Sequence, residues 1–354
     1  MSEKKEQFFE LQNLTVQYHS GNSIIHAVND VSLSLNEGET LGLVGETGAG
    51  KTTIAKSILQ ILPKNSVENA EGRILFEGND IMQMNDRDLQ SIRGKAISMI
   101  FQDPMTALNP VKTVSDQIAE GYRLHQGCTR AEAKEHALSM LKMVGIGPDR
   151  ANEFPHQFSG GMKQRVVIAL ALACSPRLLL ADEPTTALDV TIQAQVLDLI
   201  KDLRDKLGTA MILITHDLGV VADVCDNVAV IYAGRIIEKG SREDLFDHPT
   251  HPYTCGLFAA LPDLEKNVNR LSPIEGLPPD PSQIREGCDF KERCPYTCHR
   301  CDEYNNEMIE KSQGHFVRCW RACASVQELM EAPRHDGSHH KGGHHGKEHH
   351  GREV

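Results

Sequence analysis

Residues 45–52, with the sequence GETGAGKT, decide the fold of this chain. They fit the pattern G-x-x-x-x-G-K-[S/T], whose glycines let the backbone aim its N–H groups at phosphate oxygens. The apolar run Thr40–Val44 predicts a strand before the motif, and Lys51–Leu62 predicts a helix that Pro63 ends. The positive end of that helix would add to the phosphate site. A glycine-rich turn with an exposed lysine is the alternative interpretation, and both flanks argue against it.

Four side chains in and after this motif are expected to act on phosphates and a magnesium ion. Lys51 would reach the β- and γ-phosphates, and the Thr52 hydroxyl would complete the Mg²⁺ coordination sphere. The apolar strand Leu178–Ala181 ends in Asp182 and Glu183, which places both acids at the carboxyl edge of a sheet, where ligands bind. Asp182 would hold Mg²⁺, directly or through water, and Glu183 would orient or deprotonate the attacking water. Two solvated acids after a strand are the alternative.

The rest of the chain alternates strands with helices. Residues 8–40 are interpreted as strands because apolar and polar side chains alternate from 31 to 36. Residues 103–165 are expected to be mainly helical, with a further helix over 191–207 and a buried strand over 210–215. This order predicts an α/β fold with a mostly parallel sheet covered on both faces.

Composition places the chain among globular proteins, with 354 residues, of which 40% are hydrophobic and 24% charged. The longest apolar run, Val166–Cys174, is too short to span a bilayer, and residues 1–10 lack the apolar core of a secretion signal. We therefore expect a cytoplasmic location. The formal net charge of −12 argues against a nucleic-acid partner. It does not argue against ATP, because local amides and one lysine hold phosphates.

The C-terminal part has a different character. Four prolines between 273 and 281 mark an irregular linker, and six of the ten cysteines follow over 288–323. In a cytoplasmic chain such cysteines are more often metal ligands or free thiols than disulfides, and four thiolates suit iron–sulfur or zinc about equally. Residues 331–354 are rich in glycine and histidine and are expected to be disordered. Their histidine pairs could bind Ni²⁺ or Zn²⁺ weakly, or form only a polar tail.

Residues 158–165, with the sequence FSGGMKQR, carry a family resemblance. Ser159, Gly160 and Gly161 match the signature motif of ABC ATPases, usually written LSGGQ. Phenylalanine and methionine replace its leucine and glutamine, a variation similar to that of the peptide-importer branch. A serine and two glycines that open a helix create a second anion-binding helix start. Alone, the motif could also be a simple helix cap.

The remaining motifs follow the order of this family over residues 8–262. Gln102 resembles the glutamine that touches Mg²⁺ and links the nucleotide to the helical subdomain, and residues 187–189 resemble the D-loop. His216 resembles the switch histidine that contacts the γ-phosphate, and Tyr18 resembles the aromatic residue that stacks on adenine. Each of these residues alone has an ordinary structural interpretation, but their common order distinguishes the family.

The resemblance implies a P-loop NTPase of the ABC type, with a RecA-like core, an antiparallel β subdomain and a helical subdomain at about 103–165. It implies an ATPase domain over 1–262, a small cysteine-rich metal-binding domain over 263–330 and a disordered tail over 331–354. The implied catalytic residues are Lys51, Gln102, Glu183 and His216. The implied nucleotide-binding residues are Tyr18, Gly45, Glu46, Thr47, Gly48, Ala49, Gly50, Lys51, Thr52, Thr53, Gln102, Ser159, Gly160, Gly161 and Asp182. The implied Mg²⁺ ligands are Thr52, Gln102 and Asp182.

Four of the C-terminal cysteines also carry a resemblance, at the intervals x₅, x₆ and x₁₇. They are similar to the motif in which peptide-importer ATPases hold a [4Fe–4S] cluster, with zinc or no metal as alternatives. The implied ligands are Cys288, Cys294, Cys301 and Cys319. Cys298 and Cys323 lie close by in the sequence and could replace one of them.

The implied function is hydrolysis of ATP, with Mg²⁺, to drive uptake of oligopeptides or dipeptides by an ABC importer. Segments similar to the peptide branch are 216–222, 248–254 and 274–279. One copy of each motif implies a sister ATPase subunit, expected to form a heterodimer with this chain. Two membrane permease subunits, an indirect extracellular peptide-binding protein and the cytoplasmic face of the plasma membrane complete the expectation. The alternatives are an importer of nickel or another small solute, a soluble non-transport ABC ATPase, and a metal-binding regulatory protein.

Overall fold

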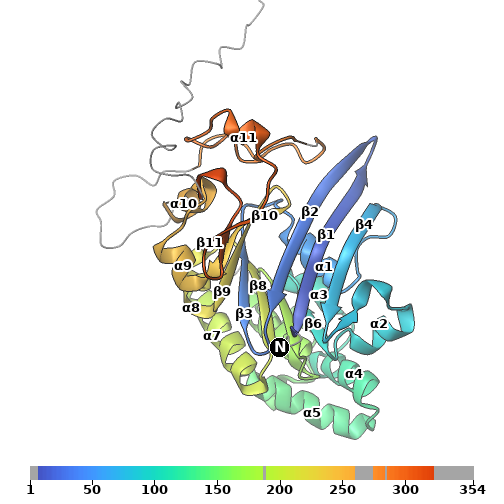
Figure 1. Ribbon diagram of the computed structural model, residues 1–354. Coiled ribbons are helices and arrows are strands. Elements are labelled where there is room, and N and C mark those ends of the chain that lie inside the picture. Colours follow the sequence, from blue (N-terminus) through green and yellow to red (C-terminus); the bar gives the residue numbers. More distant parts are fainter. Residues whose placement is uncertain (1–6, 186–188, 260–273, 284, 323–354) are drawn as a thin grey trace, which may run out of the picture.

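The computed structural model describes residues 7–185, 189–259, 274–283 and 285–322, and two sheets organise them (Figure 1). The larger sheet has eight strands within these residues, in the order β11-β12-β10-β9-β3-β8-β7-β6. Its neighbours from β9 to β6 run parallel to one another. These strands are β3 (Thr40–Val44), β6 (Ile97–Ile100), β7 (Leu178–Asp182), β8 (Ala210–Thr215) and β9 (Asn227–Tyr232).

Strands β3, β7 and β8 are buried along their whole length, as the side chains of a parallel sheet covered on both faces must be. The expected strands at 40–44 and 210–215 are confirmed at the same residues, and the strand expected over 178–181 extends to Asp182. The carboxyl ends of β3, β6, β7 and β8 lie at one edge of this sheet, because all four run in the same direction.

The other edge of the larger sheet is antiparallel. It consists of β10 (Arg235–Ser241), β11 (Ile309–Ser312) and β12 (His315–Val317). Strand β10 pairs with β9 on one side and with β12 on the other, through Glu238 opposite Val317. The cysteine-rich segment of the chain thus adds two strands to the sheet that carries the phosphate loop.

The smaller sheet is antiparallel and has the order β2-β1-β4-β5. Its strands are β1 (Phe9–Ser20), β2 (Ser23–Leu35), β4 (Val67–Phe76) and β5 (Asn79–Asp80). The alternation expected near residues 31–36 is present: Val31, Leu33 and Leu35 are buried, while the serines between them are exposed. The apolar face of this sheet packs in one core with Ile54 and Ile58 of the helix that follows the phosphate loop.

Helices cover the larger sheet and extend beyond it. They are α1 (Lys51–Ile58), α2 (Asp86–Ile92), α3 (Pro104–Ala107), α4 (Val114–Gln126), α5 (Arg130–Met143), α6 (Gly160–Leu172), α7 (Val190–Leu207), α8 (Leu218–Val224), α9 (Arg242–Asp247), α10 (Pro252–Ala259) and α11 (Arg300–Glu303). Short 3₁₀ turns lie at Ile81–Gln83, Pro148–Arg150, Pro155–Gln157 and Trp320–Ala322. The expectation that the first helix runs to Leu62 is wrong. It ends at Ile58, because Gln60 takes a left-handed backbone with φ 51° that an α-helix cannot contain.

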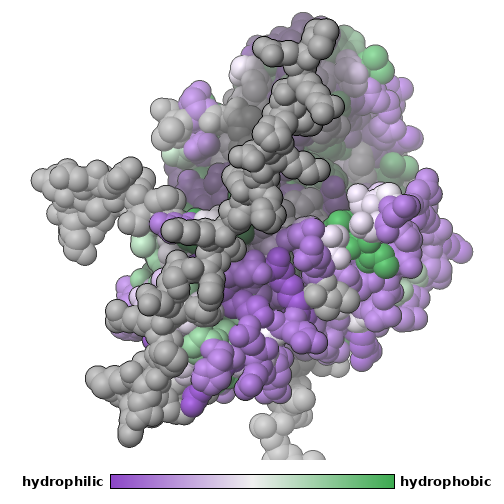
Figure 2. Space-filling view, turned by 90° about the horizontal axis from the view of Figure 1, so that it is seen from above, coloured by the Kyte–Doolittle hydropathy of each residue, from purple (hydrophilic) through white to green (hydrophobic). Residues whose placement is uncertain are grey.

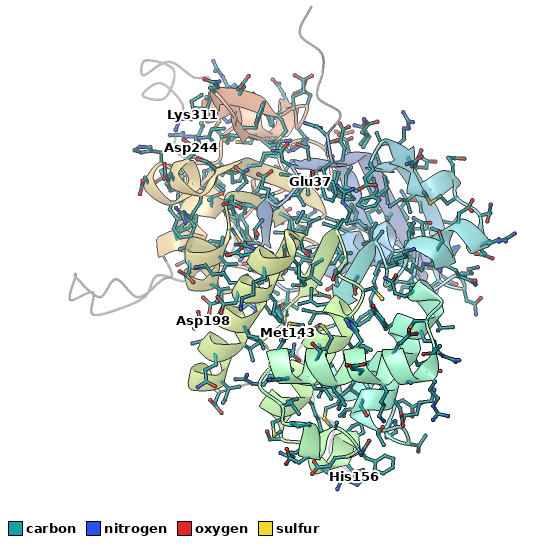
Figure 3. All side chains as sticks on the ribbon, turned by 90° about the horizontal axis from the view of Figure 1, so that it is seen from below. Glu37, Met143, His156, Asp198, Asp244 and Lys311 are labelled. Atoms are coloured by element: carbon teal, nitrogen blue, oxygen red, sulfur yellow. The ribbon has the colours of Figure 1, made fainter. Side chains whose placement is uncertain are left out.

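The segment between β6 and β7 is helical, as expected, and its helices have clear local causes. Gly127 ends α4 in a left-handed conformation, and Thr129 with Glu132 forms a reciprocal capping box at the start of α5. Figure 3 separates this segment, marked by Met143 and His156, from Asp244 and Lys311 near the C-terminal strands. The two regions lie on opposite sides of the molecule in that view.

The helices and the surface can both be compared with what a membrane-spanning protein requires. In the ranges that the structure describes, no helix has the length and apolar character needed to cross a membrane. Seen from above, the described surface is mostly hydrophilic, with scattered hydrophobic areas of which the most intensely coloured lies toward the right (Figure 2).

Candidate active site

The phosphate loop connects the end of β3 to the start of α1, the order that its sequence pattern requires. Gly50 stands at the helix start with φ 105°, and a Cβ there would lie 2.3 Å from the Ala27 carbonyl oxygen. Only glycine fits that position without moving β2. Lys51 is 5% exposed, and its Nζ donates to the carbonyl oxygens of Gly45 at 2.6 Å and Glu46 at 3.0 Å.

The electrostatics around Lys51 are those of a cation among acids. Burial lowers the pKa of Lys51, and the charges of Glu183, Asp182 and Glu46 oppose that shift. Burial raises the pKa of Asp182, which is 2% exposed, and the hydrogen bond from Thr52 works against it. The Thr52 hydroxyl donates to Asp182 Oδ1 at 3.2 Å. Two of the three expected magnesium ligands, Thr52 and Asp182, therefore lie together although they come from distant segments, and a hard divalent cation would stabilise the charged carboxylate.

Glu183 follows β7, and its side chain contacts residues that follow the two neighbouring strands, β6 and β8. Its N–H donates to the Ile214 carbonyl oxygen at 2.8 Å, and its backbone is left-handed with φ 45°. Gln102 Nε2 donates to Glu183 Oε2 at 2.9 Å, and His216 Nδ1 lies 3.4 Å from Oε1. Backbone strain of this kind in a residue other than glycine is concentrated at functional sites. The four expected catalytic residues, Lys51 included, thus belong to one constellation.

Tyr18 and the signature residues occupy different positions relative to this constellation. The Tyr18 hydroxyl donates to Thr53 Oγ1 at 3.5 Å, which links the antiparallel sheet to the first turn of α1. Ser159 caps α6 by accepting from the Met162 N–H, as its helix-start pattern predicts. Within the described ranges, no hydrogen bond joins Ser159, Gly160 or Gly161 to the phosphate loop. The D-loop residues 187 and 188 lie outside the described residues.

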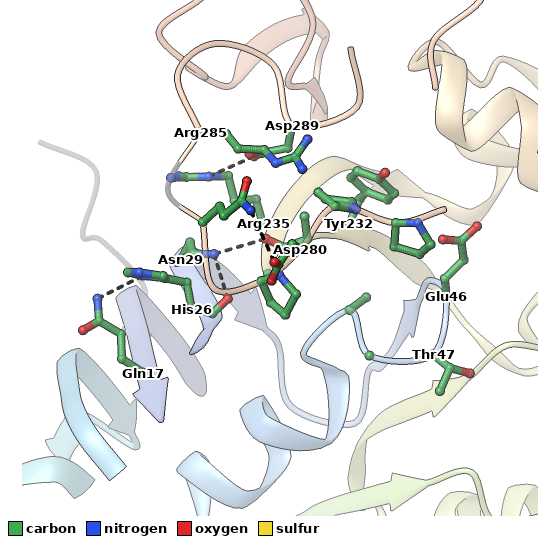
Figure 4. A pocket seen from close by; sticks show the side chains of 18 residues that line it. Gln17, His26, Asn29, Glu46, Thr47, Tyr232, Arg235, Asp280, Arg285 and Asp289 are labelled. Atoms are coloured by element: carbon green, nitrogen blue, oxygen red, sulfur yellow. Dashed lines mark hydrogen bonds and ion pairs between the residues drawn. The ribbon is translucent and has the colours of Figure 1, made fainter. Parts of the chain in front are cut away.

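Two contacts to Glu46 escaped sequence analysis. The Glu46 N–H donates to the Tyr253 hydroxyl at 2.9 Å, so this amide is held by α10. The Glu46 carboxylate accepts two hydrogen bonds from Arg293, at 2.8 and 2.9 Å. The outer side of the loop also borders a cavity of about 390 Å³, which Tyr232, Arg235 and Asp280 line from the opposite side (Figure 4). These two contacts join residues that are 207 and 247 positions apart in the sequence, so no local sequence pattern predicts them.

The four expected cysteine ligands line one small cavity, together with Phe290 and Trp320 among others. Burial raises the pKa of Cys288, Cys294 and Cys319 to about 12. The Tyr296 N–H donates to Cys294 Sγ at 3.4 Å, and Trp320 Nε1 donates to Cys301 Sγ at 3.3 Å. The backbone amides of Phe290 and Arg321 act against the rise in the pKa of Cys288 and Cys319. In the described part of the chain, no group of three or more His, Cys, Asp or Glu side chains has the arrangement of a metal site.

The other cysteines and the tail are placed only in part. Cys298 is buried and contacts Cys301, but it does not line the cavity. Cys323 and the histidine-rich residues 331–354 lie outside the described residues.

The geometry of this site defines a class of protein. A glycine-rich loop, a buried lysine, a carboxylate pair at the end of a parallel strand and a histidine at the end of the next are the parts of a nucleoside-triphosphate hydrolase. The model of the ABC transporter family matches residues 28–186, and the model of the oligopeptide/dipeptide transporter C-terminal region matches residues 237–301.

Similar proteins and solved structures indicate the same class of protein. The dipeptide transport ATP-binding protein DppD of Bacillus subtilis is 49% identical over 318 residues, which cover 89% of this chain and 95% of that protein. The oligopeptide transport ATP-binding protein OppD of Salmonella typhimurium is 44% identical over 324 residues, covering 91% and 95%. A dimeric post-hydrolysis structure of the ATP-binding cassette MJ0796 with ADP and Pi matches with a TM-score of 0.60, 30% identity, and coverage of 66% and 98%.

The chain therefore belongs to the ATP-binding proteins of ABC transporters, in their oligopeptide/dipeptide group. It has the ABC ATPase fold with a mixed sheet and helices, and members of this family use ATP with Mg²⁺.

Proposed function

We propose that this chain hydrolyses ATP to drive the import of dipeptides or oligopeptides through membrane permease subunits. The observation that carries the proposal is the convergence of Lys51, Asp182, Glu183, Gln102 and His216 at one edge of the larger sheet. Similarity to named dipeptide and oligopeptide transport ATP-binding proteins over about nine tenths of the chain supports the cargo class.

The residues have distinct tasks in this proposal. Lys51 neutralises the β- and γ-phosphates, while Thr52 and Asp182, already in contact, hold the magnesium ion together with Gln102. Glu183 orients and deprotonates the attacking water, and His216 contacts the γ-phosphate from the next strand. Tyr18 stacks on adenine, and the backbone from Gly45 to Gly50 and Thr53 cradle the phosphates.

The second half of the site comes from another subunit. Ser159, Gly160 and Gly161 form the exposed start of α6, which suits them to an ATP molecule held by a partner's phosphate loop. We infer a sister ATPase in a heterodimer, two permeases, and an extracellular peptide-binding protein that acts through them. The complex would place this chain on the cytoplasmic face of the plasma membrane, with an ATPase unit over 1–262 and a cysteine-rich unit over 263–330.

The first prediction tests motor and cargo together. Phosphate release by the chain, assembled with its co-purifying membrane subunits in vesicles, should rise severalfold when a peptide-loaded binding protein is added. The same binding protein without peptide is the control. Hydrolysis that ignores peptide but responds to nickel-loaded binding protein would overturn the peptide assignment and favour the nickel importer. A chain that never associates with membrane subunits would contradict the motor role itself.

A second function, metal binding, is proposed for the cysteine-rich segment. Its support is the donor set: Cys288, Cys294, Cys301 and Cys319 line one cavity, and the sulfurs of Cys294 and Cys301 each accept an N–H hydrogen bond of the kind that stabilises thiolate ligands. We propose that these four thiolates hold a [4Fe–4S] cluster, with zinc as the alternative. The cluster would contribute a cross-link for a short segment, and its binding would release the thiol protons.

The second prediction concerns metal content. Anaerobically purified chain should contain about four irons and about four sulfides, the stoichiometry of a [4Fe–4S] cluster, with visible absorption near that of such clusters. Cys301→Ser should lose most of the iron, because its sulfur lies at the cavity next to Trp320. Cys128→Ser, which lies between α4 and α5 and outside the cysteine-rich segment, should keep the iron. Zinc in place of iron would retain the site and change the metal, whereas neither metal in stoichiometric amount would overturn the assignment.

A further inference from the structure

Arg293 connects the cysteine-rich segment directly to the phosphate loop. Its guanidinium group makes a two-pronged contact with the Glu46 carboxylate, with Nη1 at 2.8 Å from Oε2 and Nη2 at 2.9 Å from Oε1. The side chain of Arg293 is 5% exposed and that of Glu46 is 27% exposed. A bidentate, desolvated contact of this kind fixes geometry as well as charge, unlike a solvated surface pair.

The surroundings of Arg293 hold it in one orientation. Its Nε donates to the Glu275 carbonyl oxygen at 3.0 Å, and its Nη1 donates to the Tyr232 hydroxyl oxygen at 3.4 Å. The ring of Tyr232 packs against Phe290 and Tyr253, beside the guanidinium group. An arginine guanidinium group is always charged in proteins, so Arg293 meets the Glu46 carboxylate as a cation.

The contact acts on the part of the loop that holds the catalytic lysine. The Glu46 N–H is bound by Tyr253, and its carboxylate by Arg293, so two elements of the C-terminal half fix this residue. The carbonyl oxygens of Gly45 and Glu46 are in turn the acceptors of Lys51 Nζ. A displacement of Glu46 would therefore move the acceptors of Lys51.

Charge is the second consequence. Glu46 is an acid within a loop that must bind a triphosphate, and its carboxylate contributes to the electrostatics of Lys51. Arg293 neutralises that carboxylate. Without the guanidinium group, an uncompensated, partly buried anion would remain in the phosphate loop, and such an anion is costly.

We propose that Arg293 is a positioning residue for ATP binding. It holds Glu46, and with it the phosphate loop, in place, and it cancels the charge of the Glu46 carboxylate. The inference rests on the proposed ATP site and extends it to a residue of the cysteine-rich segment. Cys294 follows Arg293 directly, so the guanidinium group and one of the cavity-lining cysteines belong to the same backbone segment.

The third prediction is a double-mutant comparison on the full chain, with ATP affinity measured by titration of a fluorescent ATP analogue. Arg293→Met should weaken ATP binding about tenfold, equivalent to roughly 1.4 kcal/mol. The double variant Arg293→Met with Glu46→Gln should recover to within about threefold of wild type, because the uncompensated charge is gone. In the assembled transporter, Arg293→Met should raise KM for ATP more than it lowers kcat. Lys291→Met, two residues away and paired with Asp302, is the matched control and should bind ATP normally.

These outcomes distinguish a role of Arg293 that acts through the charge of Glu46 from a merely structural role. Rescue by the second substitution requires that charge at Glu46 causes the defect, whereas a double variant as weak as Arg293→Met, or an Arg293→Met chain that binds normally, overturns the proposal. If Arg293→Met does not fold, Arg293→Gln takes its place, with the same expected tenfold loss and the same rescue by Glu46→Gln; an Arg293→Gln chain that binds ATP normally overturns the proposal. Peptide-stimulated hydrolysis is measured separately, so failure of the import function leaves this comparison readable.

Discussion

Glu183→Gln should reduce ATP hydrolysis at this chain's own site by about a thousandfold, within the range that a positioned general base contributes. Glutamine keeps the shape of the side chain and can still contact Gln102 and His216, but it cannot take a proton from water. ATP should still bind, because Lys51, Thr52 and Asp182 are untouched. Phosphate release by the assembled transporter, together with ATP affinity of the isolated chain, measures both effects.

The matched control for this substitution is Asp198→Asn, which removes an exposed carboxylate from α7 (Figure 3). It should leave hydrolysis unchanged, because it lies apart from the strand ends that form the site. Phosphate release by the Glu183→Gln transporter equal to that of wild type would contradict the assignment of Glu183. Loss of ATP binding along with hydrolysis would instead show that the left-handed backbone at this position had been disturbed.

The core of the fold could be predicted because its strands are local and strongly patterned. Strands β3 and β8 are continuous apolar runs bounded by polar or turn residues, so their ends were visible in the sequence. The position of Asp182 and Glu183 at the carboxyl edge of the sheet followed from the same reasoning. Gln102 and His216 were expected from the family resemblance, and they follow the strands on either side of β7. The end of α1 was missed because the left-handed Gln60 precedes the proline on which the prediction relied.

The C-terminal segment could not be predicted in the same way. Strands β11 and β12 have four and three residues, too few for a periodic signal, and β12 pairs with a strand far earlier in the chain. The contacts of Tyr253 and Arg293 with Glu46 depend on where α10 and the cysteine-rich loops pack, which no local pattern encodes. The cysteine spacing suggested a separate metal-binding unit, and it gave no indication that the same segment supports the phosphate loop.

Lys51→Met should weaken ATP binding about a hundredfold, because charge-assisted hydrogen bonds to phosphate oxygens are among the strongest single contacts in such sites. Methionine keeps much of the apolar length of lysine but leaves Asp182 and Glu183 without the cation that now balances them. The pH dependence gives a second signature. Since burial lowers the pKa of Lys51, ATP affinity of the wild type should fall as pH rises through that lowered value, where the lysine loses its proton.

The same titration on Lys51→Met should lack that alkaline loss of affinity, because the group responsible is absent. Lys64→Met, which removes an exposed lysine just beyond α1, should keep both the wild-type affinity and its pH dependence. A Lys51→Met chain that binds ATP within about threefold of wild type, a difference of under 1 kcal/mol, would contradict the phosphate role of Lys51. The carbonyl oxygens of Gly45 and Glu46 accept hydrogen bonds from Lys51 Nζ in this structure, so they help to set where the ammonium group meets the phosphates. The position of those two carbonyls therefore sets part of the affinity, which is why a contact as remote in sequence as Arg293–Glu46 can act on the same step.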